Sequence, residues 1–165
     1  MYVTAPPLVK LGFDIRGLMQ AIANCKASDA LRCQFSQPNW DILAGYMQPF
    51  SLNSGQVLIE QGALDRTLYF IESGTLSVHY EDGKSSIHMA LVGPGTVLGE
   101  GAFFSHQARS ATVQASSPCR LWCLTPIRFL ELANRHSPIA LELTMGMGAV
   151  MAKRLYNQPK RVAVT

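Results

Sequence analysis

The sequence predicts a mainly β domain with helices at both ends, and three observations support this fold class. Between positions 56 and 124, short apolar segments alternate with polar residues and are separated by glycine-containing turns. The segments before and after carry apolar residues at the three- and four-residue spacing of amphipathic helices. Many short strands in succession favour a sandwich or barrel over an alternating α/β sheet.

Length and composition are those of one domain with a substantial core, since 48% of the 165 residues are hydrophobic. A net charge of +3 is too small to indicate a nucleic-acid partner by itself. Lys10, Asp14 and Arg16 interrupt the apolar residues that a secretory signal would need, and no stretch is long enough to predict a membrane span. Four cysteines without a dense framework favour reduced thiols. We therefore expect a cytoplasmic protein.

Two helices are expected before the strands. Apolar residues at helical spacing predict the first over 13–27, and we expect it to cap the β part rather than to dock on a partner. Ser36, followed two positions later by Pro38, predicts the start of the second helix, which Pro49 should end.

The strands are expected where apolar and polar residues alternate between turns. They cover 57–59, 68–71, 76–81, 86–91, 111–115 and 119–124, with a hairpin turn at 81–84. Thr125 followed by proline then predicts a helix that runs to about Arg135.

A longer last helix is expected over 138–157. Thr144, Gly148 and Ala152 form a row of small residues along it. Because glycine inside a helix costs about 1 kcal/mol relative to alanine, Gly146 and Gly148 predict compensating contacts, such as the close approach of another backbone. Packing of this helix on its own β domain alone is the alternative.

The most informative stretch lies between Glu100 and Arg109, nine positions apart. A short helical turn between them would leave backbone N–H groups that favour an anion. The Arg109 guanidinium suits a phosphate, and Ser110 adds a hydroxyl beside it. A phosphate would repel Glu100, so this carboxylate should receive neutral hydroxyls. The pattern predicts a ligand with one phosphate near one sugar, while a surface ion pair is the alternative.

Residues 99–102 (Gly-Glu-Gly-Ala) and 109–111 (Arg-Ser-Ala) resemble the phosphate-binding cassette of the cyclic-nucleotide-binding domain family. This family includes catabolite-activator-like regulators and the regulatory subunits of cAMP-dependent kinase. Residues 61–74, with Gly62 and Gly74, resemble the glycine-turned strands of the same family. The resemblance covers about 36–157. It implies a β-roll, of double-stranded β-helix or jelly-roll type, with N-terminal helices and a C-terminal helix pair.

The resemblance also implies a site. Arg109 would neutralise the phosphate and Glu100 would accept from the ribose 2′-hydroxyl. Gly99 and Ala102 would contribute backbone contacts, and Ser110 its hydroxyl and N–H. The implied ligand is cAMP, with cGMP or another cyclic nucleotide as alternatives, and binding would draw Arg109 and the short turn inward.

Four residues bear on how well such a ligand would bind. Gly101 stands where the family often has a bulky aliphatic residue, and Gln107-Ala108 precedes the arginine where a threonine–proline pair is common. Both departures would weaken binding. Tyr156 is the candidate to stack on the base.

The implied organisation is an extension over 1–35 with one helix, a cyclic-nucleotide-binding domain over 36–157, and a tail over 158–165. Helix 138–157 would form a homodimer, and the output would pass to an unknown protein effector. Catabolite-activator relatives place a DNA-binding module after this helix, but only eight residues follow Asn157. We therefore expect no DNA binding by this chain alone and no contact with a membrane.

Two other functional classes remain as alternatives. One is an interaction module that keeps the β-roll but binds no cyclic nucleotide. The other is an enzyme, which would need grouped metal ligands or a nucleophile–base pair, and the sequence groups neither. Cys25 and Cys33 are eight positions apart, and Cys119 and Cys123 four, so neither pair has the two-residue gap of metal sites. We expect core cysteines, no metal and no catalytic residue.

Overall fold

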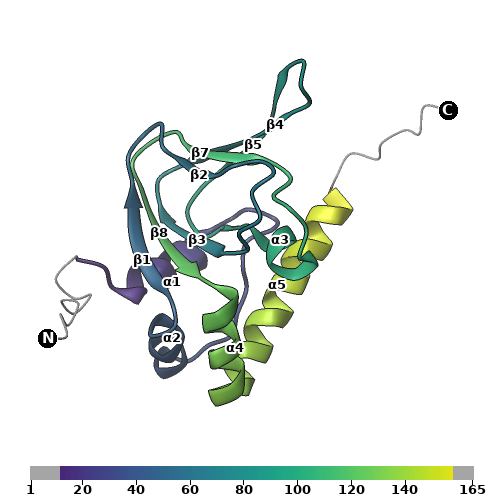
Figure 1. The fold of residues 1–165 in the computed structure, drawn as a ribbon. Helices are drawn as coiled ribbons and strands as arrows, with labels where there is room; N and C mark the ends of the chain where they lie inside the picture. The colour runs from purple at the N-terminus through teal and green to yellow at the C-terminus, as the bar shows by residue number, and fades with distance from the viewer. Residues whose placement is uncertain (1–11, 158–165) are drawn as a thin grey trace, which may run out of the picture.

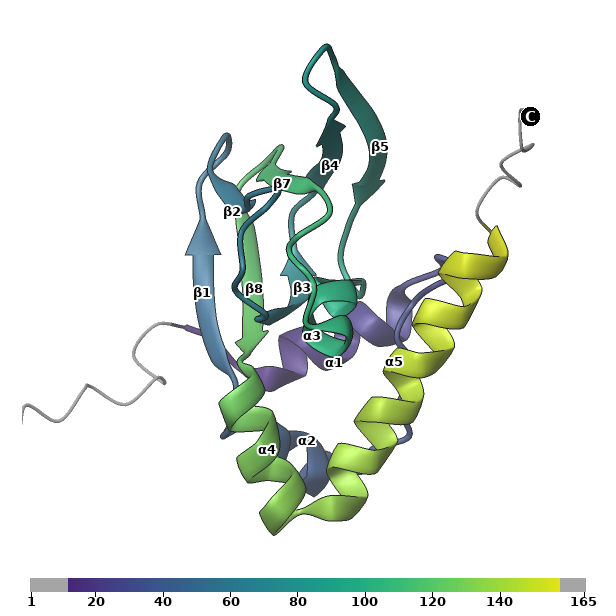
Figure 2. The same cartoon turned by 45° about the vertical axis from the view of Figure 1, so that its right-hand side comes forward.

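A computed structural model describes residues 12–157 of the chain. Strands form a roll of two four-stranded sheets, and helices gather at one end and along one side of it (Figures 1 and 2). The predicted fold class, β-sheets with flanking helices, is confirmed. The helices are α1 (Ile15–Asn24), α2 (Gln37–Ala44), α3 (Glu100–Ser105), α4 (Pro126–Arg135) and α5 (Ser137–Asn157).

The strands all pair in antiparallel fashion. They are β1 (Gln48–Leu52), β2 (Val57–Ile59), β3 (Leu68–Ser73), β4 (Leu76–Glu81), β5 (Ser86–Val92), β6 (Val97–Leu98), β7 (Thr112–Ala115) and β8 (Cys119–Leu124). One sheet has the order β1-β8-β3-β6 and the other β2-β7-β4-β5.

Strand β8 separates two apolar cores, because both of its faces are buried. Cys119 and Leu121 point into the core between the two sheets. Trp122 and Leu124 point into a second core that the sheet shares with the helices. The roll and its helices therefore form one packed body, so a change in helix position alters the packing against the sheet.

Helix α1 packs on the roll, as expected of a capping helix. Its buried residues Ile15, Leu18 and Ile22 belong to the core shared with α2, α4 and α5. The Asp14 side chain accepts from the N–H of Arg16 and starts the helix. The helix is shorter than the predicted 13–27.

The second helix also ends earlier than predicted, at Ala44 rather than at Pro49. Pro49 lies inside β1, a strand absent from the sequence-based prediction. Because β1 is an edge of its sheet, a proline without an N–H is tolerated there. The two-residue strand β6 was likewise not predicted.

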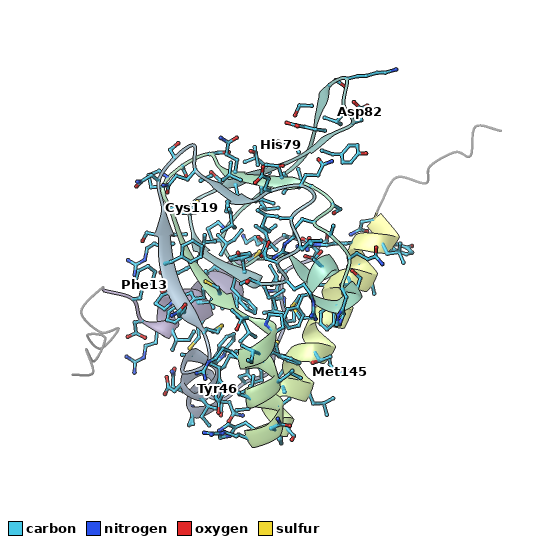
Figure 3. The ribbon with its side chains drawn as sticks, viewed as in Figure 1. Phe13, Tyr46, His79, Asp82, Cys119 and Met145 are labelled. Atoms are coloured by element: carbon cyan, nitrogen blue, oxygen red, sulfur yellow. The ribbon has the colours of Figure 1, made fainter. Side chains whose placement is uncertain are left out.

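The hairpin of β4 and β5 projects from the roll, and its predicted turn is confirmed. Asp82, labelled at its tip in Figure 3, accepts hydrogen bonds from the N–H groups of Lys84 and Ser85. These backbone hydrogen bonds lower the pKa of the Asp82 carboxyl, and the bond from Ser85 has the largest effect.

The two last helices begin and end close to the predicted positions. Gly146 of α5 has the close contact predicted to compensate for a glycine inside a helix. A Cβ at this position would lie 2.7 Å from Sγ of Cys33. Gly148 faces away, and a Cβ there would meet no atom of the described chain within 4 Å. Within residues 12–157, no helix has the length and apolar character to cross a membrane.

Candidate functional site

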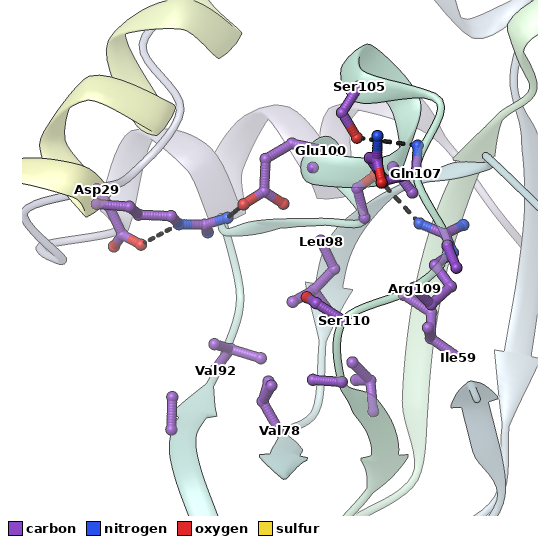
Figure 4. A pocket seen from close by; sticks show the side chains of 18 of the residues that line it. Asp29, Ile59, Val78, Val92, Leu98, Glu100, Ser105, Gln107, Arg109 and Ser110 are labelled. Atoms are coloured by element: carbon purple, nitrogen blue, oxygen red, sulfur yellow. Dashed lines mark hydrogen bonds and ion pairs between the residues drawn. The ribbon is translucent and has the colours of Figure 1, made fainter. Parts of the chain in front are cut away.

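A pocket of about 610 Å³ opens beside α3 and is bounded by strands of the second sheet and by α5 (Figure 4). It is lined by all five residues that the sequence predicts for the ligand: Gly99, Glu100, Ala102, Arg109 and Ser110. Apolar side chains form the rest of its roll-side wall: Ile59, Val78, Val92, Leu98 and Val113. The roles of the five residues stay predictions, but the fold brings them to one cavity.

Arg109 is held in the wall of this pocket, and only 3% of its side chain is exposed. Its Nη2 donates to Oδ2 of Asp65 and to the carbonyl of Thr67, both at 2.7 Å. Its Nε donates to Oδ1 of Asp65 at 3.4 Å, and its Nη1 to the carbonyl of Gly99 at 3.1 Å. These bonds occupy four of the five N–H groups of a guanidinium. One N–H of Nη1 is left for a ligand, as far as residues 12–157 show.

Asp65 is the counterion of this arginine, and it does not line the pocket. The hydrogen bond from Arg109 is the largest cause that lowers the pKa of Asp65, against the opposing effect of burial. The carboxylate thus lies behind the guanidinium and fixes its plane. Its 49% exposure limits the energy of the pair.

Gly99 makes this placement of Arg109 possible. Its φ is +85°, a conformation that side chains rarely adopt. A Cβ at this position would lie 2.6 Å from Nη1 of Arg109 and 2.7 Å from the carbonyl oxygen of Thr67. Both the backbone conformation and the space next to the guanidinium therefore require glycine.

The predicted short helical turn between the two charged residues is α3. Its first turn leaves backbone N–H groups without partners inside the helix, next to the pocket. At its other end Arg66 donates to the carbonyls of Ala102 and Phe103, at 3.3 and 3.0 Å. His106, at φ +61°, ends the helix and contacts Nη2 of Arg66 at 3.1 Å. The turn is thus fixed at both ends.

Glu100 is joined to α5 by an ion pair that the sequence reasoning missed. Nη1 of Arg154 lies 2.6 Å from Oε1 of Glu100. The same guanidinium binds Oδ2 of Asp29 through Nε and the carbonyl of Val97 through Nη2, both at 2.7 Å. Figure 4 shows the contacts of this guanidinium with Glu100 and Asp29, with Asp29 across the view from Arg109.

Arg154, near the end of α5, therefore lines the pocket. Burial lowers the pKa of Arg154, but the charge of Glu100 and the hydrogen bonds to Asp29 and Glu100 raise it more. No local pattern could have revealed these contacts, because Asp29, Glu100 and Arg154 are far apart in the sequence. The same holds for Asp65 and Arg109.

The remaining predicted contacts are placed as follows. Tyr156 is 89% exposed and does not line the pocket, so its predicted stacking on a base is wrong for this structure. Asn157 and Ser28 line the pocket instead. A Cβ on Gly101 would meet nothing within 4 Å, so this departure from the family pattern leaves open space rather than a changed contact.

The cysteines and other metal-binding residue types lie apart. Cys119 is buried and Cys123 is half-buried, and burial raises the pKa of the Cys123 thiol to about 11. In the described part of the chain, no three histidine, cysteine, aspartate or glutamate residues are grouped as metal ligands.

Comparison with known proteins gives one family. A model of the family described as "Cyclic nucleotide-binding domain" matches residues 49–136. The cAMP-activated global transcriptional regulator CRP of Pasteurella multocida is 32% identical over 113 residues, which are 67% of this chain and 52% of that protein. Glutaminase 2 of Bradyrhizobium diazoefficiens is 33% identical over 102 residues, which are 62% of this chain and 16% of that protein. The chain thus spans about half of the first relative and a sixth of the second.

A solved cyclic nucleotide-binding domain from Methylobacillus flagellatus has the same fold. It matches with a TM-score of 0.76 at 20% identity, over 86% of this chain and 78% of its own. The matched family residues include the whole stretch from Glu100 to Arg109 and most strands of the roll. This chain belongs to the cyclic nucleotide-binding domain family.

Proposed function

We propose that this chain is a cAMP-sensing regulatory module and not an enzyme. The single observation that carries the proposal is that one pocket gathers all five predicted ligand residues, with a buried guanidinium on one side and a carboxylate on the other. The cyclic phosphate would lie against the remaining N–H of Arg109 and the amides of α3. The ribose 2′-hydroxyl would donate to Glu100.

Two features of the electrostatics support a singly charged ligand. Arg109 is already desolvated and oriented by Asp65, so a phosphate meets a donor that needs no further ordering. Arg154, which Glu100 shares with Asp29, offsets part of the negative charge of Glu100 that would otherwise repel the anion. Only Oε1 of Glu100 is bonded to Arg154, so Oε2 remains to accept a hydroxyl.

The signal would pass through Arg154. This side chain links the cassette at Glu100 to α5, so a ligand that changes the Glu100 contacts shifts the population of α5 positions. The output would reach a second copy of the chain or a protein effector.

Calorimetric titration with cAMP, cGMP and 2′-deoxy-cAMP tests the ligand. We expect micromolar binding of cAMP, about 2 kcal/mol weaker in Arg109→Ala, because a charged hydrogen-bond partner of the phosphate is lost. The 2′-deoxy ligand should bind more weakly than cAMP to the wild type. The two ligands should bind equally to Glu100→Ala, which has no side-chain acceptor for the 2′-hydroxyl. Arg16→Ala is the control, since Arg16 is exposed and far from the pocket in the fold. Unchanged binding in Arg109→Ala would contradict the assignment.

We also propose that α5 forms a homodimer. Five positions along α5 follow one another at intervals of four and three residues, the spacing of a two-helix seam. They are Leu141, Met145, Gly148, Ala152 and Leu155, and the three large ones are 63%, 65% and 73% exposed. Met145 is labelled in Figure 3 on the side of α5 away from the roll. The close approach of a second α5 would explain Gly148, which meets nothing within the described chain.

Sedimentation velocity tests the dimer with two variants of α5. Met145→Glu places a charge in the seam and should give a monomer at concentrations where the wild type is dimeric. Lys153→Glu changes the charge outside the seam and should leave the dimer intact. A monomeric wild type at high concentration would overturn the proposal.

A nucleotide-independent interaction module is the second candidate, and one observation favours it. The two charged residues predicted to touch the ligand already have protein partners, Asp65 for Arg109 and Arg154 for Glu100. A protein that dimerises through α5 but shows no heat of binding with any cyclic nucleotide would be this module.

A further inference from the structure

The C-terminal end of α3 is held by a side chain from outside the helix. Arg66, in the loop between β2 and β3, donates through Nε to the carbonyl of Ala102 and through Nη2 to that of Phe103. Both carbonyls belong to the last turn of α3, where a helix leaves carbonyls short of partners. Arg66 therefore closes the end of α3 opposite to Glu100, its first residue.

The position of α3 depends on such contacts because the helix has only six residues. An isolated helix of this length is not stable in water, so tertiary contacts decide where it lies. Ala102 and Phe103 are buried, but apolar contacts have no direction, whereas the hydrogen bonds from Arg66 do. The helix carries Glu100 and Ala102, two of the five predicted ligand residues (Figure 4). A shift of α3 therefore moves part of the predicted site.

His106 in turn contacts Arg66. Nε2 of the imidazole lies 3.1 Å from Nη2 of the guanidinium. A guanidinium has only donors, so Nε2 must be the acceptor and carry no proton. The contact therefore requires a neutral imidazole with its proton on Nδ1.

The backbone of His106 is also set by these contacts. Its φ is +61°, and within residues 12–157 it is the one residue other than glycine with a positive φ. A side chain makes this conformation costly, and it persists where the surrounding structure holds it. The N–H of His106 donates to the carbonyl of Ala102, and its ring contacts Arg66. The end of α3 is thus a strained conformation that Arg66 helps to hold.

Arg66 is the charged group that contacts this imidazole in the described part of the chain. No carboxylate of residues 12–157 forms an ion pair with His106. Helix α4 packs against α3 through an aromatic ring, which does not titrate. Charged residues of the neighbouring loop and helices form ion pairs of their own: Asp65 with Arg109, Arg128 of α4 with Glu131, and Glu100 with Arg154.

Proton uptake by His106 would break the contact. The proton would go to Nε2, so two donors would face each other and a second positive charge would lie against Arg66. The dipole of α3 by itself favours a cation at this end of the helix. Arg66 already occupies two carbonyls of the last turn, so the repulsion between the two cations dominates.

We propose that Arg66 is a positioning residue for the cyclic-nucleotide site and that protonation of His106 releases it. Histidine is the side chain that ordinarily changes its charge between about pH 5 and 8. At the upper end of this range, neutral His106 keeps Arg66 on α3, and Glu100 stays in place for the ligand. As the pH falls, the contact is lost, α3 loosens and the affinity for the ligand decreases. This inference rests on the proposed function for its ligand.

Calorimetric titration with cAMP at about pH 8 and about pH 5.5 tests the inference. We expect the affinity of the wild type to fall about fivefold at the lower pH, the upper limit for a contact between partly exposed charges. His106→Asn should bind equally at both pH values, because asparagine tolerates a positive φ and takes up no proton. His136→Asn, at the C-cap of α4, is the matched control and should keep the full pH dependence.

Arg66→Ala separates positioning from a general loss of structure. It should bind cAMP about fivefold more weakly than the wild type at about pH 8, because the carbonyls of α3 lose their donor. Its affinity should not fall further at the lower pH, since His106 then has no cation to repel. A merely structural role of Arg66 would weaken binding but leave the pH dependence in place.

Ligand-free protein gives a second measurement that does not depend on cAMP. In nuclear magnetic resonance spectra of nitrogen-labelled wild type, the Nε signal of Arg66 should shift as the pH is lowered over the same range. The signal should stay in place in His106→Asn. An Arg66 signal that does not respond in the wild type would overturn the contact.

The outcomes separate this inference from the proposed function. A wild-type affinity for cAMP that is constant or rises at the lower pH, or a pH dependence that persists in His106→Asn or Arg66→Ala, would overturn the positioning role while the cyclic-nucleotide site stands. If no cyclic nucleotide binds the wild type at either pH, the proposed function fails and the positioning role fails with it.

Discussion

The two arginines of the pocket differ in how they are held. Arg109 is 3% exposed, and its partners all belong to the roll. Arg154 is 23% exposed, and its partners come from the segment between α1 and α2, from β6 and from α3. The first is a fixed anchor inside the matched family region. The second joins elements that lie partly outside it, so it can transmit movement where the anchor cannot.

This difference has an energetic origin. A buried guanidinium is stable only while its hydrogen bonds are made, so any state that exposes Arg109 is costly. A partly exposed guanidinium exchanges protein partners for water at a lower cost, so the contacts of Arg154 can break and re-form. Ligand binding should therefore change the surroundings of Arg154 more than those of Arg109.

Replacing each arginine by alanine should separate the two roles most clearly. Arg109→Ala should lower the free energy of unfolding by about 3 kcal/mol, because it leaves a void and the unpaired carbonyls of Thr67 and Gly99. Arg154→Ala should lower it by about 1 kcal/mol, because water replaces its partners. Urea unfolding of both variants measures the two values. Equal losses of unfolding free energy in the two variants would show that the two arginines are held equally rigidly.

Arg154→Gln should weaken cAMP binding about tenfold, as measured by calorimetry, because Glu100 loses its orientation and its negative charge, no longer offset by Arg154, repels the phosphate. Lys153→Gln is the control, since this neighbouring cation is exposed and does not line the pocket. Tighter binding in Arg154→Gln would mean that Arg154 competes with the ligand instead of supporting its site.

Replacing Asp65, the counterion of Arg109, should have the smallest effect on stability. Arg109 lowers the pKa of Asp65 in the folded protein, so the pair stabilises the fold above the unfolded pKa and stops doing so as pH falls through the folded value. Asp65→Asn should cost about 1 kcal/mol of stability near neutral pH, because Asp65 is half exposed. The difference from wild type should shrink below about pH 4, as followed by urea unfolding. If the stability difference between wild type and Asp65→Asn stayed constant at all pH values, the charge of Asp65 would not be its cause.

Much of the roll was predictable because its signals are local. Alternation identified β4 and β5, and Thr125 with its proline located the start of α4. Strand β1 was missed because Pro49 argues against a strand unless the edge position is known. A proline at a sheet edge and a proline after a helix look alike in the sequence.

The candidate site divides in the same way. Glu100 and Arg109 could be paired from their spacing, since the residues between them form a single turn. Asp65 and Arg154 could not, because only the closed roll and the return of α5 bring them to the pocket. The sequence alone therefore predicts the groups that would touch a ligand, while the groups that orient them emerge from the fold.

Nuclear magnetic resonance of the arginine guanidinium groups tests the central claim most directly. Spectra of nitrogen-labelled protein are recorded with cAMP and with adenosine, and Arg109→Lys assigns the Arg109 signals. The account predicts that cAMP shifts the Nη1 signals of Arg109 and that adenosine, which lacks the phosphate, leaves them unchanged. Arg109 signals that stay in place with saturating cAMP would contradict it.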